Sequence, residues 1–329
     1  MKNKAKELLK NKHKTFPILS FPSTQLLKTN INELISSSDM IAKGMKAIAD
    51  SCDIGAVFSM MDLSVEAECF GAKIRFSETD VPTVEKGIMD DISQTQNILV
   101  PNATDKRAGI FIDGVKKAKN EIKDIPVFCG VIGPYSLAGR LFDMTDLMME
   151  CFDNPEQVKT LLEKSTQFIK TYIKEFKDAG ADGVILAEPA AGLLSPSLAQ
   201  EFSMPFVQEI FDEIDSDDFL ICYHNCGNSA QAMLEDIKKL HADIIHLGNA
   251  IDIKKALEIM PQDKIVSGNI NPVFFRTKQP EDIKNEIQLL YDECASYDNF
   301  IISSGCDIPA AAKWENINAY FEKINGLYT

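Results

Sequence analysis

The feature that most constrains the fold is a series of short apolar segments, each ending in Gly, Pro, Asn or Ser and most followed by a helix-like stretch. Most segments are almost continuously apolar, which is typical of parallel strands covered on both faces. The pattern predicts an α/β fold, a single (β/α)8 TIM barrel spanning residues 1–329. The eight segments are Phe16–Phe21, Ile54–Ser59, Pro126–Ile132, Gly183–Ala187, Phe219–Asn225, Ile244–Gly248, Lys264–Asn269 and Phe300–Gly305.

One stretch departs from this regular pattern. Residues 60–124 are too many for a single connection between strand and helix, so we expect an inserted segment after the second strand, lying on the barrel rim as a lid. Its start, residues 66–76, predicts a β-hairpin that turns at Gly71. Helices are predicted near residues 84–97 and 106–122, after Ser38-Asp39, from Asn154-Pro155-Glu156 onward, and over Trp314–Leu327.

Charge and composition exclude several classes of partner. The 49 acidic and 34 basic residues give a net charge of −15, so we expect neither nucleic acid nor an anionic membrane surface as a partner. No stretch approaches the roughly 18 consecutive apolar residues of a membrane span, and residues 1–14 carry no apolar signal-peptide core. The 8 cysteines are too few for a disulfide scaffold and predict reduced thiols in a cytoplasmic protein.

In a barrel of this type the reactive side chains lie where the strands end at their carboxyl termini, because only the loops there converge above the packed core. Polar residues at these positions are therefore the candidates for chemistry. They are Glu188, His224, Cys226, Asn249, Asn269, Asn271, Cys306 and Asp307.

Three of these residues form a candidate metal site. His224 and Cys226 are two positions apart and project to the same side of a strand, and Cys306 can approach them across the barrel mouth. One nitrogen and two sulfur donors suit Zn²⁺, and three protein ligands leave one position open, as in catalytic zinc sites. Two other interpretations remain open, namely a histidine and two cysteines that are simply buried, and a Cys-His nucleophilic pair.

The remaining thiols and imidazoles are interpreted as structural. Free cysteines behave as small apolar residues and are among the most buried side chains in proteins. We expect Cys69 in the predicted hairpin, and we expect the other cysteines in the core or on helices. The remaining histidines, His13, His241 and His246, are expected to be structural or on the surface. The expected core cysteines are Cys52, Cys129, Cys151, Cys222 and Cys294.

Further side chains are candidates for catalysis or for binding a substrate. Glu188 is the candidate catalytic carboxylate, and its alternatives are a fourth metal ligand or an anchor for the following loop. Arg75, in the predicted lid, and Arg140 are the basic residues best placed to meet an anionic substrate. Asn249 and Asn269 are further candidates for substrate binding.

Four segments of the chain stand out as motifs. They are Gly133-Pro134-Tyr135-Ser136-Leu137-Ala138, Leu193-Leu194-Ser195-Pro196, Gly268-Asn269-Ile270-Asn271-Pro272 and Gly305-Cys306-Asp307-Ile308-Pro309. They resemble marker segments of the uroporphyrinogen decarboxylase superfamily, and the similarity covers nearly the whole chain. Within that superfamily, the order His224, Cys226 and much later Cys306 resembles the zinc-dependent corrinoid methyltransferases, including the methylcobamide:coenzyme M type.

The resemblance implies a zinc ion held by His224, Cys226 and Cys306. It also implies methyl transfer between a corrinoid, carried by a corrinoid protein, and a small thiol such as coenzyme M. A zinc-bound thiol loses its proton and stays nucleophilic at neutral pH, which makes this donor set suitable for such chemistry. The opposite direction, from a small methyl donor to the corrinoid, would use the same ligands.

Two alternatives of other classes remain. A decarboxylase of the uroporphyrinogen type needs no metal, but the Arg-rich N-terminal signature of that branch has no counterpart here. Residues 16–23 stand in its place, and no arginine precedes Arg75. The second alternative is a non-catalytic barrel that only binds a corrinoid protein or a tetrapyrrole.

Overall fold

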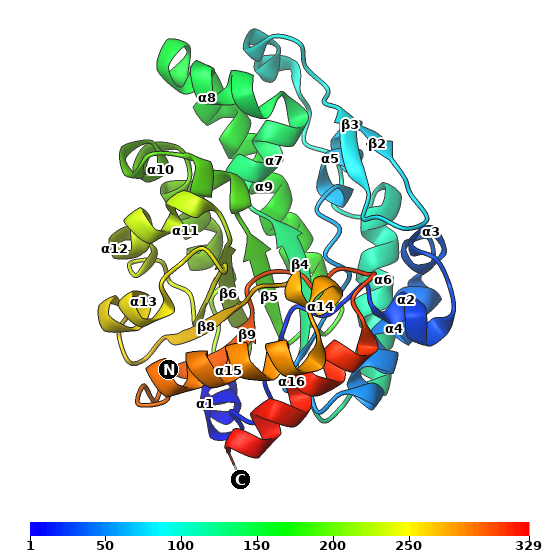
Figure 1. Ribbon diagram of the computed structural model, residues 1–329. Helices are drawn as coiled ribbons and strands as arrows, with labels where there is room; N and C mark the ends of the chain where they lie inside the picture. Colours follow the sequence, from blue (N-terminus) through cyan, green and yellow to red (C-terminus); the bar gives the residue numbers. More distant parts are fainter. Residues whose placement is uncertain (329) are drawn as a thin grey trace.

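The computed structural model describes residues 1–328 and has a curled parallel sheet at its centre, surrounded by helices (Figure 1). Among these residues the sheet contains seven strands in the order β1-β4-β5-β6-β7-β8-β9, and all neighbouring pairs are parallel. This α/β barrel confirms the predicted fold class. The strands are β1 Val57–Phe58, β4 Val127–Ile132, β5 Gly183–Ala187, β6 Leu220–Asn225, β7 Ile244–Leu247, β8 Ile265–Ile270 and β9 Phe300–Ser304.

The helices cover the outer face of the sheet and the ends of the barrel (Figure 1). None of those within residues 1–328 is long and apolar enough to cross a membrane. The α-helices are α1 Asn3–Lys10, α2 Ser23–Leu27, α3 Ile31–Ile35, α4 Ser38–Ser51, α5 Val65–Phe70, α6 Lys106–Glu121, α7 Pro134–Leu141, α8 Met144–Asp153, α9 Pro155–Asp178, α10 Pro196–Phe202, α11 Met204–Ile214, α12 Leu234–Ile237, α13 Ile253–Ile259, α14 Phe274–Thr277, α15 Pro280–Cys294 and α16 Trp314–Leu327. The 3-10 helices are η1 Ile92–Asn97, η2 Pro189–Leu193 and η3 Asn228–Met233.

Local sequence accounts for the long outer helices. In α9, Pro155 occupies the first turn, where its missing N–H costs nothing, and Leu161, Leu162 and Phe168 face the core at helical spacing. The predicted helices after Ser38-Asp39, from Asn154 and over Trp314–Leu327 are confirmed as α4, α9 and α16.

The first predicted strand is not a strand. Residues 15–20 are extended and buried, but they carry no strand ladder, so this prediction is wrong. The segment lies between β9 and the start of β1: Gly55 N–H donates to Thr15 O at 2.9 Å, and Ile18 N–H donates to the Ser304 hydroxyl at 3.1 Å. Because its bonds to β9 run through side-chain oxygens, the segment bridges the gap in the barrel without continuing the sheet.

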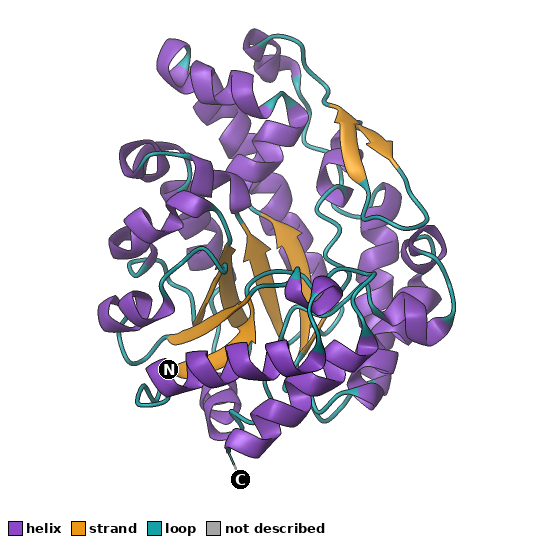
Figure 2. Cartoon of the chain, viewed as in Figure 1, coloured by secondary structure: helices purple, strands orange, loops and turns teal. Residues whose placement is uncertain are grey.

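Residues 60–124 also differ from the prediction in detail. The expected hairpin at 66–76 is wrong, because its first half is helix α5, which ends at Gly71 with φ 103°. The hairpin lies further on, where β2 Lys73–Arg75 pairs antiparallel with β3 Thr83–Lys86, away from the central sheet (Figure 2). The expected helix at 84–97 is reduced to η1, whereas the helix expected at 106–122 is confirmed as α6.

The amino ends of the strands are covered by α1 and by lysines within it and directly before it. Lys2 Nζ lies 3.0 Å from Asp243, which precedes β7, and 2.7 Å from Asp215. Lys4 Nζ lies 2.8 Å from Asp182, which precedes β5. These ion pairs attach α1 to the lower end of the barrel.

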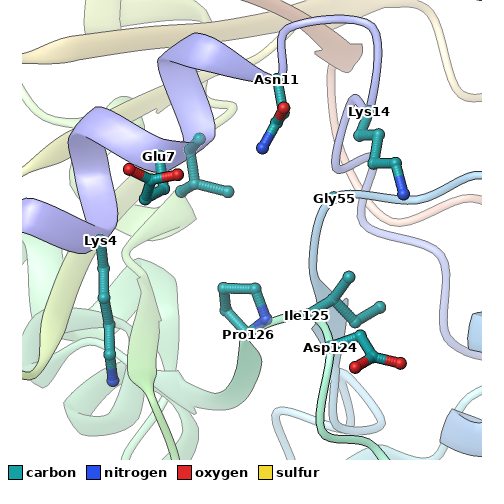
Figure 3. Close-up of a pocket in the computed structure, with 9 residues that line it drawn as sticks. Lys4, Glu7, Asn11, Lys14, Gly55, Asp124, Ile125 and Pro126 are labelled. Atoms are coloured by element: carbon teal, nitrogen blue, oxygen red, sulfur yellow. The ribbon is translucent and has the colours of Figure 1, made fainter.

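A cavity of about 380 Å³ opens beside α1 at this lower end (Figure 3). Residues of α1 line one side, and Gly55 with residues 124–126 line the other. The cavity lies at the opposite end from the predicted reactive residues. In barrels of this type, residues at that end usually serve stability rather than catalysis. Both lysines that line the cavity are already paired, since Lys4 meets Asp182 and Lys14 meets Asp53 at 3.3 Å.

Candidate metal centre

The structure brings the three predicted metal ligands together at the carboxyl end of the barrel. The potential ligand atoms of His224, Cys226 and Cys306 all lie within 4.8 Å of one another. The two Sγ atoms are 3.8 Å apart, although 79 residues separate the cysteines in the sequence. The cluster joins β6 to the loop after β9, as the sequence predicted for strands that meet across the barrel mouth.

Strand geometry positions each member of the cluster. His224 is the penultimate residue of β6 and is 2% exposed, and Cys226 follows the strand directly. Gly248, after β7, allows the close approach of the neighbouring loop, because a Cβ there would lie 2.5 Å from Cys226 Cα. Cys306 comes two residues after the end of β9. Both cysteines are half-buried, whereas His224 is buried.

The cluster fits a zinc ion. His224 Nε2 is buried and has no hydrogen-bond partner among the described residues, which is costly unless a ligand occupies it. Two sulfurs at the usual Zn–S distance of about 2.3 Å in tetrahedral geometry are about 3.8 Å apart, which agrees with the observed separation. One imidazole and two thiolates are also the donors that zinc prefers.

The two thiols influence each other's ionisation. The Cys306 thiol donates a hydrogen bond to Cys226 Sγ, which lowers the pKa of Cys226 against the opposing effect of burial. The same hydrogen bond, together with burial, raises the pKa of Cys306 to about 12. The hydrogen bond therefore favours the Cys226 thiolate and opposes ionisation of Cys306. A cation bound by both sulfurs would displace the remaining proton.

A second histidine, which the sequence interpretation placed among structural or surface residues, touches this cluster. His246 is 0% exposed and stands beside His224 in the register of β6 and β7. Its Nδ1 lies 2.8 Å from His224 Nδ1, and its Nε2 lies 3.1 Å from the Ser303 hydroxyl. Burial and the neighbouring His224 hold the pKa of His246 well below its ordinary value, so its imidazole is neutral. The sequence contained a usable sign, since both histidines are penultimate in neighbouring apolar strands.

Glu188 lies directly after β5, as predicted, but both of its carboxylate oxygens are engaged. They accept hydrogen bonds from the N–H groups of Tyr135 at 2.9 Å and Ser136 at 2.7 Å, and from the Ser136 hydroxyl. Gly133 makes this possible, because a Cβ there would lie 2.4 Å from the carboxylate. Glu188 thus caps the amino end of α7. Burial raises its pKa to about 7, against the lowering effect of these hydrogen bonds and of Arg140.

The two predicted substrate-binding arginines occupy different environments. Arg75 is exposed on β2. Arg140, in the last turn of α7, donates to Ser136 O at 3.2 Å and lines a cavity of about 400 Å³ together with Met61, Leu63 and residues 81–84. Burial lowers the pKa of Arg140, but its guanidinium remains charged at neutral pH.

The two asparagines predicted to bind substrate also differ in their environments. Asn269 uses its amide to donate to Gly248 O at 2.9 Å and Ile251 O at 2.7 Å, so it holds the loop after β7. Asn249 is exposed beside this loop, and both side chains border a cavity of about 310 Å³. A Cβ on Gly305 would lie 2.7 Å from Asn249 N, which places Asn249 next to the segment that carries Cys306.

Sequence reasoning also missed a group of buried charges beneath the hairpin. Arg107 of α6 forms ion pairs with Asp62 and, at 2.6 Å, with Glu68 of α5. Glu66 Oε1 accepts from Ile132 N–H at 2.9 Å, whereas Oε2 is buried without a partner in the described part of the chain. Burial raises the pKa of Glu66 to about 7. The alternation Glu66-Ala67-Glu68 suggested a strand, whereas the helix turns the two carboxylates toward different neighbours.

Comparison with known proteins gives one family and two kinds of relative. The family model for uroporphyrinogen decarboxylase (URO-D) matches residues 20–327. A methylcobamide:CoM methyltransferase from Methanosarcina acetivorans is 25% identical over 272 residues, which are 81% of this chain and 78% of the relative. A uroporphyrinogen decarboxylase from Chlorobium phaeovibrioides is 25% identical over 269 residues, which are 79% of this chain and 75% of the relative.

The overall architecture matches a solved structure. A methyltransferase from Methanosarcina mazei superposes with a TM-score of 0.86 at 20% sequence identity, covering 96% of this chain and 95% of that chain. At this identity the likeness shows a shared fold. It supports the α/β barrel described above.

Proposed function

The chain belongs to the uroporphyrinogen decarboxylase (URO-D) family, as its sequence motifs predicted, and from this premise we propose that it is a zinc-dependent corrinoid methyltransferase. In this proposal a methyl group moves between a corrinoid, carried by a corrinoid protein, and a small thiol such as coenzyme M. The relatives named methylcobamide:CoM methyltransferase support the kind of reaction.

The observation that carries the proposal is the set of three ligand atoms gathered at the barrel mouth. His224 Nε2 has no partner within residues 1–328, and the two sulfurs are 3.8 Å apart. A decarboxylase that works without metal has no need of this arrangement. His224, Cys226 and Cys306 would hold the ion and leave its fourth position open toward the mouth.

The chemistry that zinc supplies in such a site is to keep a bound substrate thiol as a nucleophilic thiolate at neutral pH. The protein side chains prepare the site for it. Cys226 and Cys306 contribute two negative charges when deprotonated, and His224 contributes a neutral nitrogen. Their half-buried position at the mouth lets a corrinoid protein approach from above the carboxyl ends of the strands.

We further propose that Arg140 binds the anionic group of the substrate. Its guanidinium borders the cavity of about 400 Å³ beside the hairpin of β2 and β3, and only one of its hydrogen bonds, to Ser136 O, is made within the described chain. Glu188 supports it indirectly by capping the helix on which Arg140 lies. Of the three roles considered for Glu188, the anchor agrees best with its two engaged oxygens.

The hairpin of β2 and β3 then acts as the lid of this cavity. Residues 81–84 of the hairpin line the cavity opposite Arg140, and Arg75 is exposed on the paired strand. Asn249 and Asn269 border the other cavity at the mouth, on the side of Cys306. We expect them to shape the approach of substrate rather than to react.

The test is a metal assay followed by a transfer assay. Protein purified without added zinc should contain about one zinc per chain and should transfer methyl groups from methylcobalamin to coenzyme M. Removal of the metal with a chelator should abolish transfer, and zinc should restore it. Full activity of metal-free protein would contradict the proposal.

The URO-D relatives at equal identity favour one competing function, decarboxylation of a porphyrinogen. This reaction would need cationic residues for several carboxylates, whereas the first arginine of the chain is Arg75. Incubation of the metal-free protein with uroporphyrinogen tests it directly. Methyl transfer from a small donor to a Co(I) corrinoid is tested in the same assay run in reverse, and absence of all three activities would leave a binding protein.

A further inference from the structure

We propose that His246 is a positioning residue that fixes the proton of His224 on Nδ1 and so keeps His224 Nε2 free to bind the metal. This inference rests on the proposed metal site. Nothing in the sequence motifs assigns His246 a role, and it lies outside the set of three ligands.

The contact between the two histidines is built into the sheet. His224 and His246 are register partners on β6 and β7, so their side chains leave the sheet on the same side. Their rings meet edge to face, with centroids 4.8 Å apart, and their Nδ1 atoms are 2.8 Å apart. Both rings are at most 2% exposed, so water does not compete for this hydrogen bond.

Only one of the two Nδ1 atoms carries the shared proton. If His246 donates, His224 Nδ1 is the acceptor, and the His224 proton must then reside on Nε2, which removes the lone pair that a metal needs. If His224 donates, its Nε2 is free. The unpartnered Nε2 of His224 agrees with the second arrangement, because an N–H there would be a buried donor without an acceptor among residues 1–328.

A chain of polar groups behind His246 favours the same arrangement. When His246 accepts at Nδ1, its proton lies on Nε2, which is 3.1 Å from the Ser303 hydroxyl oxygen. The Ser303 hydroxyl in turn donates to Phe16 O at 3.3 Å, so its oxygen is free to accept. The carbonyl at the end cannot donate, and therefore the hydrogen bonds run in one direction, from His224 through His246 and Ser303 to Phe16.

The extended segment that replaces the first strand thus has a part in the metal site. Phe16 O ends the relay because residues 15–20 lie against β9. A hydrogen bond from the second nitrogen of a metal-bound histidine orients the ring and increases its basicity. Here two acceptors of His246 face His224 Nδ1, namely the imidazole Nδ1 at 2.8 Å and the backbone oxygen at 3.3 Å, and the imidazole is the nearer.

The first test measures the proton positions in metal-free protein. Long-range ¹H–¹⁵N spectra of protein with ¹⁵N-labelled histidine distinguish protonated from unprotonated ring nitrogens, and single substitutions assign the four histidines. We expect the proton of His224 on Nδ1 and that of His246 on Nε2. The reverse pattern, with the proton of His224 on Nε2, would overturn the proposal.

The second test compares variants by their zinc affinity in competition with a chelator. His246→Leu removes the nearer acceptor and leaves His224 Nδ1 only the backbone oxygen of residue 246 at 3.3 Å, so zinc binding should weaken about 10- to 100-fold. His246→Asn keeps an acceptor oxygen near the former Nδ1 and should restore much of the loss. Ser303→Ala breaks the next link and should shift the His224 proton toward Nε2.

Ser267→Ala is the matched control. Ser267 is the register partner of His246 on β8, is 0% exposed, and has a hydroxyl without a partner in the described chain, so its loss should leave zinc affinity unchanged. Wild-type affinity in His246→Leu would overturn the proposal. If His246→Leu does not fold, the zinc affinity of Ser303→Ala and the wild-type spectra still test the proposed role of His246. A wild type that binds no zinc would instead refute the proposed function, whereas the spectra would still decide the proton positions.

Discussion

The two ends of the barrel treat charged and polar groups in opposite ways. At the amino ends of the strands, Asp182, Asp215 and Asp243 each lie within 3.0 Å of a lysine nitrogen from the N-terminal segment. At the carboxyl ends, Glu66 has an unpartnered oxygen and His224 an unpartnered nitrogen, as judged over residues 1–328. The amino end pairs its carboxylates with lysines, whereas the carboxyl end also has a compensated group, Arg107 with Asp62 and Glu68, but leaves two buried polar atoms without a partner.

The same difference is visible in the pKa values of individual carboxylates. Burial acts to raise the pKa of Asp182, but hydrogen bonds from Lys119, Lys4 and Val127 N–H outweigh it, and the pKa lies below its ordinary value. Burial also raises the pKa of Glu66, where two backbone hydrogen bonds and Arg140 do not compensate, and the value reaches about 7. The presence of a contacting cation, rather than burial itself, decides the direction.

The largest expected effect comes from Cys306→Ser at the carboxyl end. Loss of a direct ligand should reduce zinc affinity and methyl transfer by more than the roughly 100-fold that loss of an outer partner causes. Zinc stoichiometry and the transfer rate measure it. The matched control is Cys222→Ala, a buried core cysteine on β6, which should lower only stability. Equal loss of zinc in both variants would contradict the division of the cysteines between core and site.

Glu66→Gln should stabilise the protein at high pH. The pKa of Glu66 is raised from 4.5 to about 7, so the folded protein keeps this carboxyl protonated at pH values where the unfolded chain has lost the proton. The protonated carboxyl therefore makes its full contribution to the unfolding free energy below pH 4.5. This contribution is lost as the pH rises toward 7 and above. At pH 8 the variant should therefore exceed wild type in unfolding free energy by on the order of 3 kcal/mol, with no difference near pH 4.

Urea unfolding between pH 4 and pH 8 measures this difference. Glu163→Gln, on an exposed position of α9, is the control and should follow the wild-type curve. The contrary result is a wild-type unfolding free energy that stays constant between pH 4.5 and 7 and does not change with Glu66→Gln. It would show that the carboxyl end of the barrel compensates the charge of Glu66.

Asp182→Asn tests the lower end and should have the opposite pH dependence. The pKa of Asp182 is lowered, so its contribution is present above pH 3.8 and is lost as the pH falls through the folded-state value. Since the lysines are partly exposed, we expect a loss of about 2 kcal/mol at pH 7, less than for a fully buried pair. Denaturant unfolding at pH 7 and pH 3 measures it, and zinc content should not change. A loss of zinc in this variant would mean that the two ends are coupled.

The smallest effect is expected for Arg75→Ala. Arg75 is exposed on β2, so the unfolding free energy should change by less than about 0.5 kcal/mol. The KM for the anionic thiol should also change little, whereas Arg140→Gln should raise it clearly. A large rise in KM for Arg75→Ala would show that the hairpin closes over the cavity and brings Arg75 to the substrate.

Much of the architecture follows from local sequence patterns. Continuous apolar runs predicted six strands of the sheet within a residue or two, and also the position of the short β1, because parallel strands are buried on both faces. His224, Cys226 and Cys306 were predicted as a group because parallel strands end at the same side of a barrel. These inferences need only the period of a strand and the direction of the chain.

Other features depend on contacts between distant segments. The segment at residues 15–20 has the composition of a strand, but its bonding to β9 through Ser304 prevents a ladder. The helix α5 forms where alternation suggested a strand, because Arg107 from α6 pairs with Asp62 and Glu68 on either side of its first turn.

The sequence by itself thus determined the barrel and the three residues at its mouth, since the order of strands and the residues at their ends are local properties. Only the tertiary structure decided which buried groups lack hydrogen-bond partners, and that His246 lies within hydrogen-bond distance of His224. The sequence shows only that His246 is penultimate in an apolar strand, as His224 is in its own, and the role of His246 depends on a distance of 2.8 Å between the two side chains. Hydrogen-bond partners and charge compensation depend on three-dimensional proximity, which no periodicity in the sequence encodes.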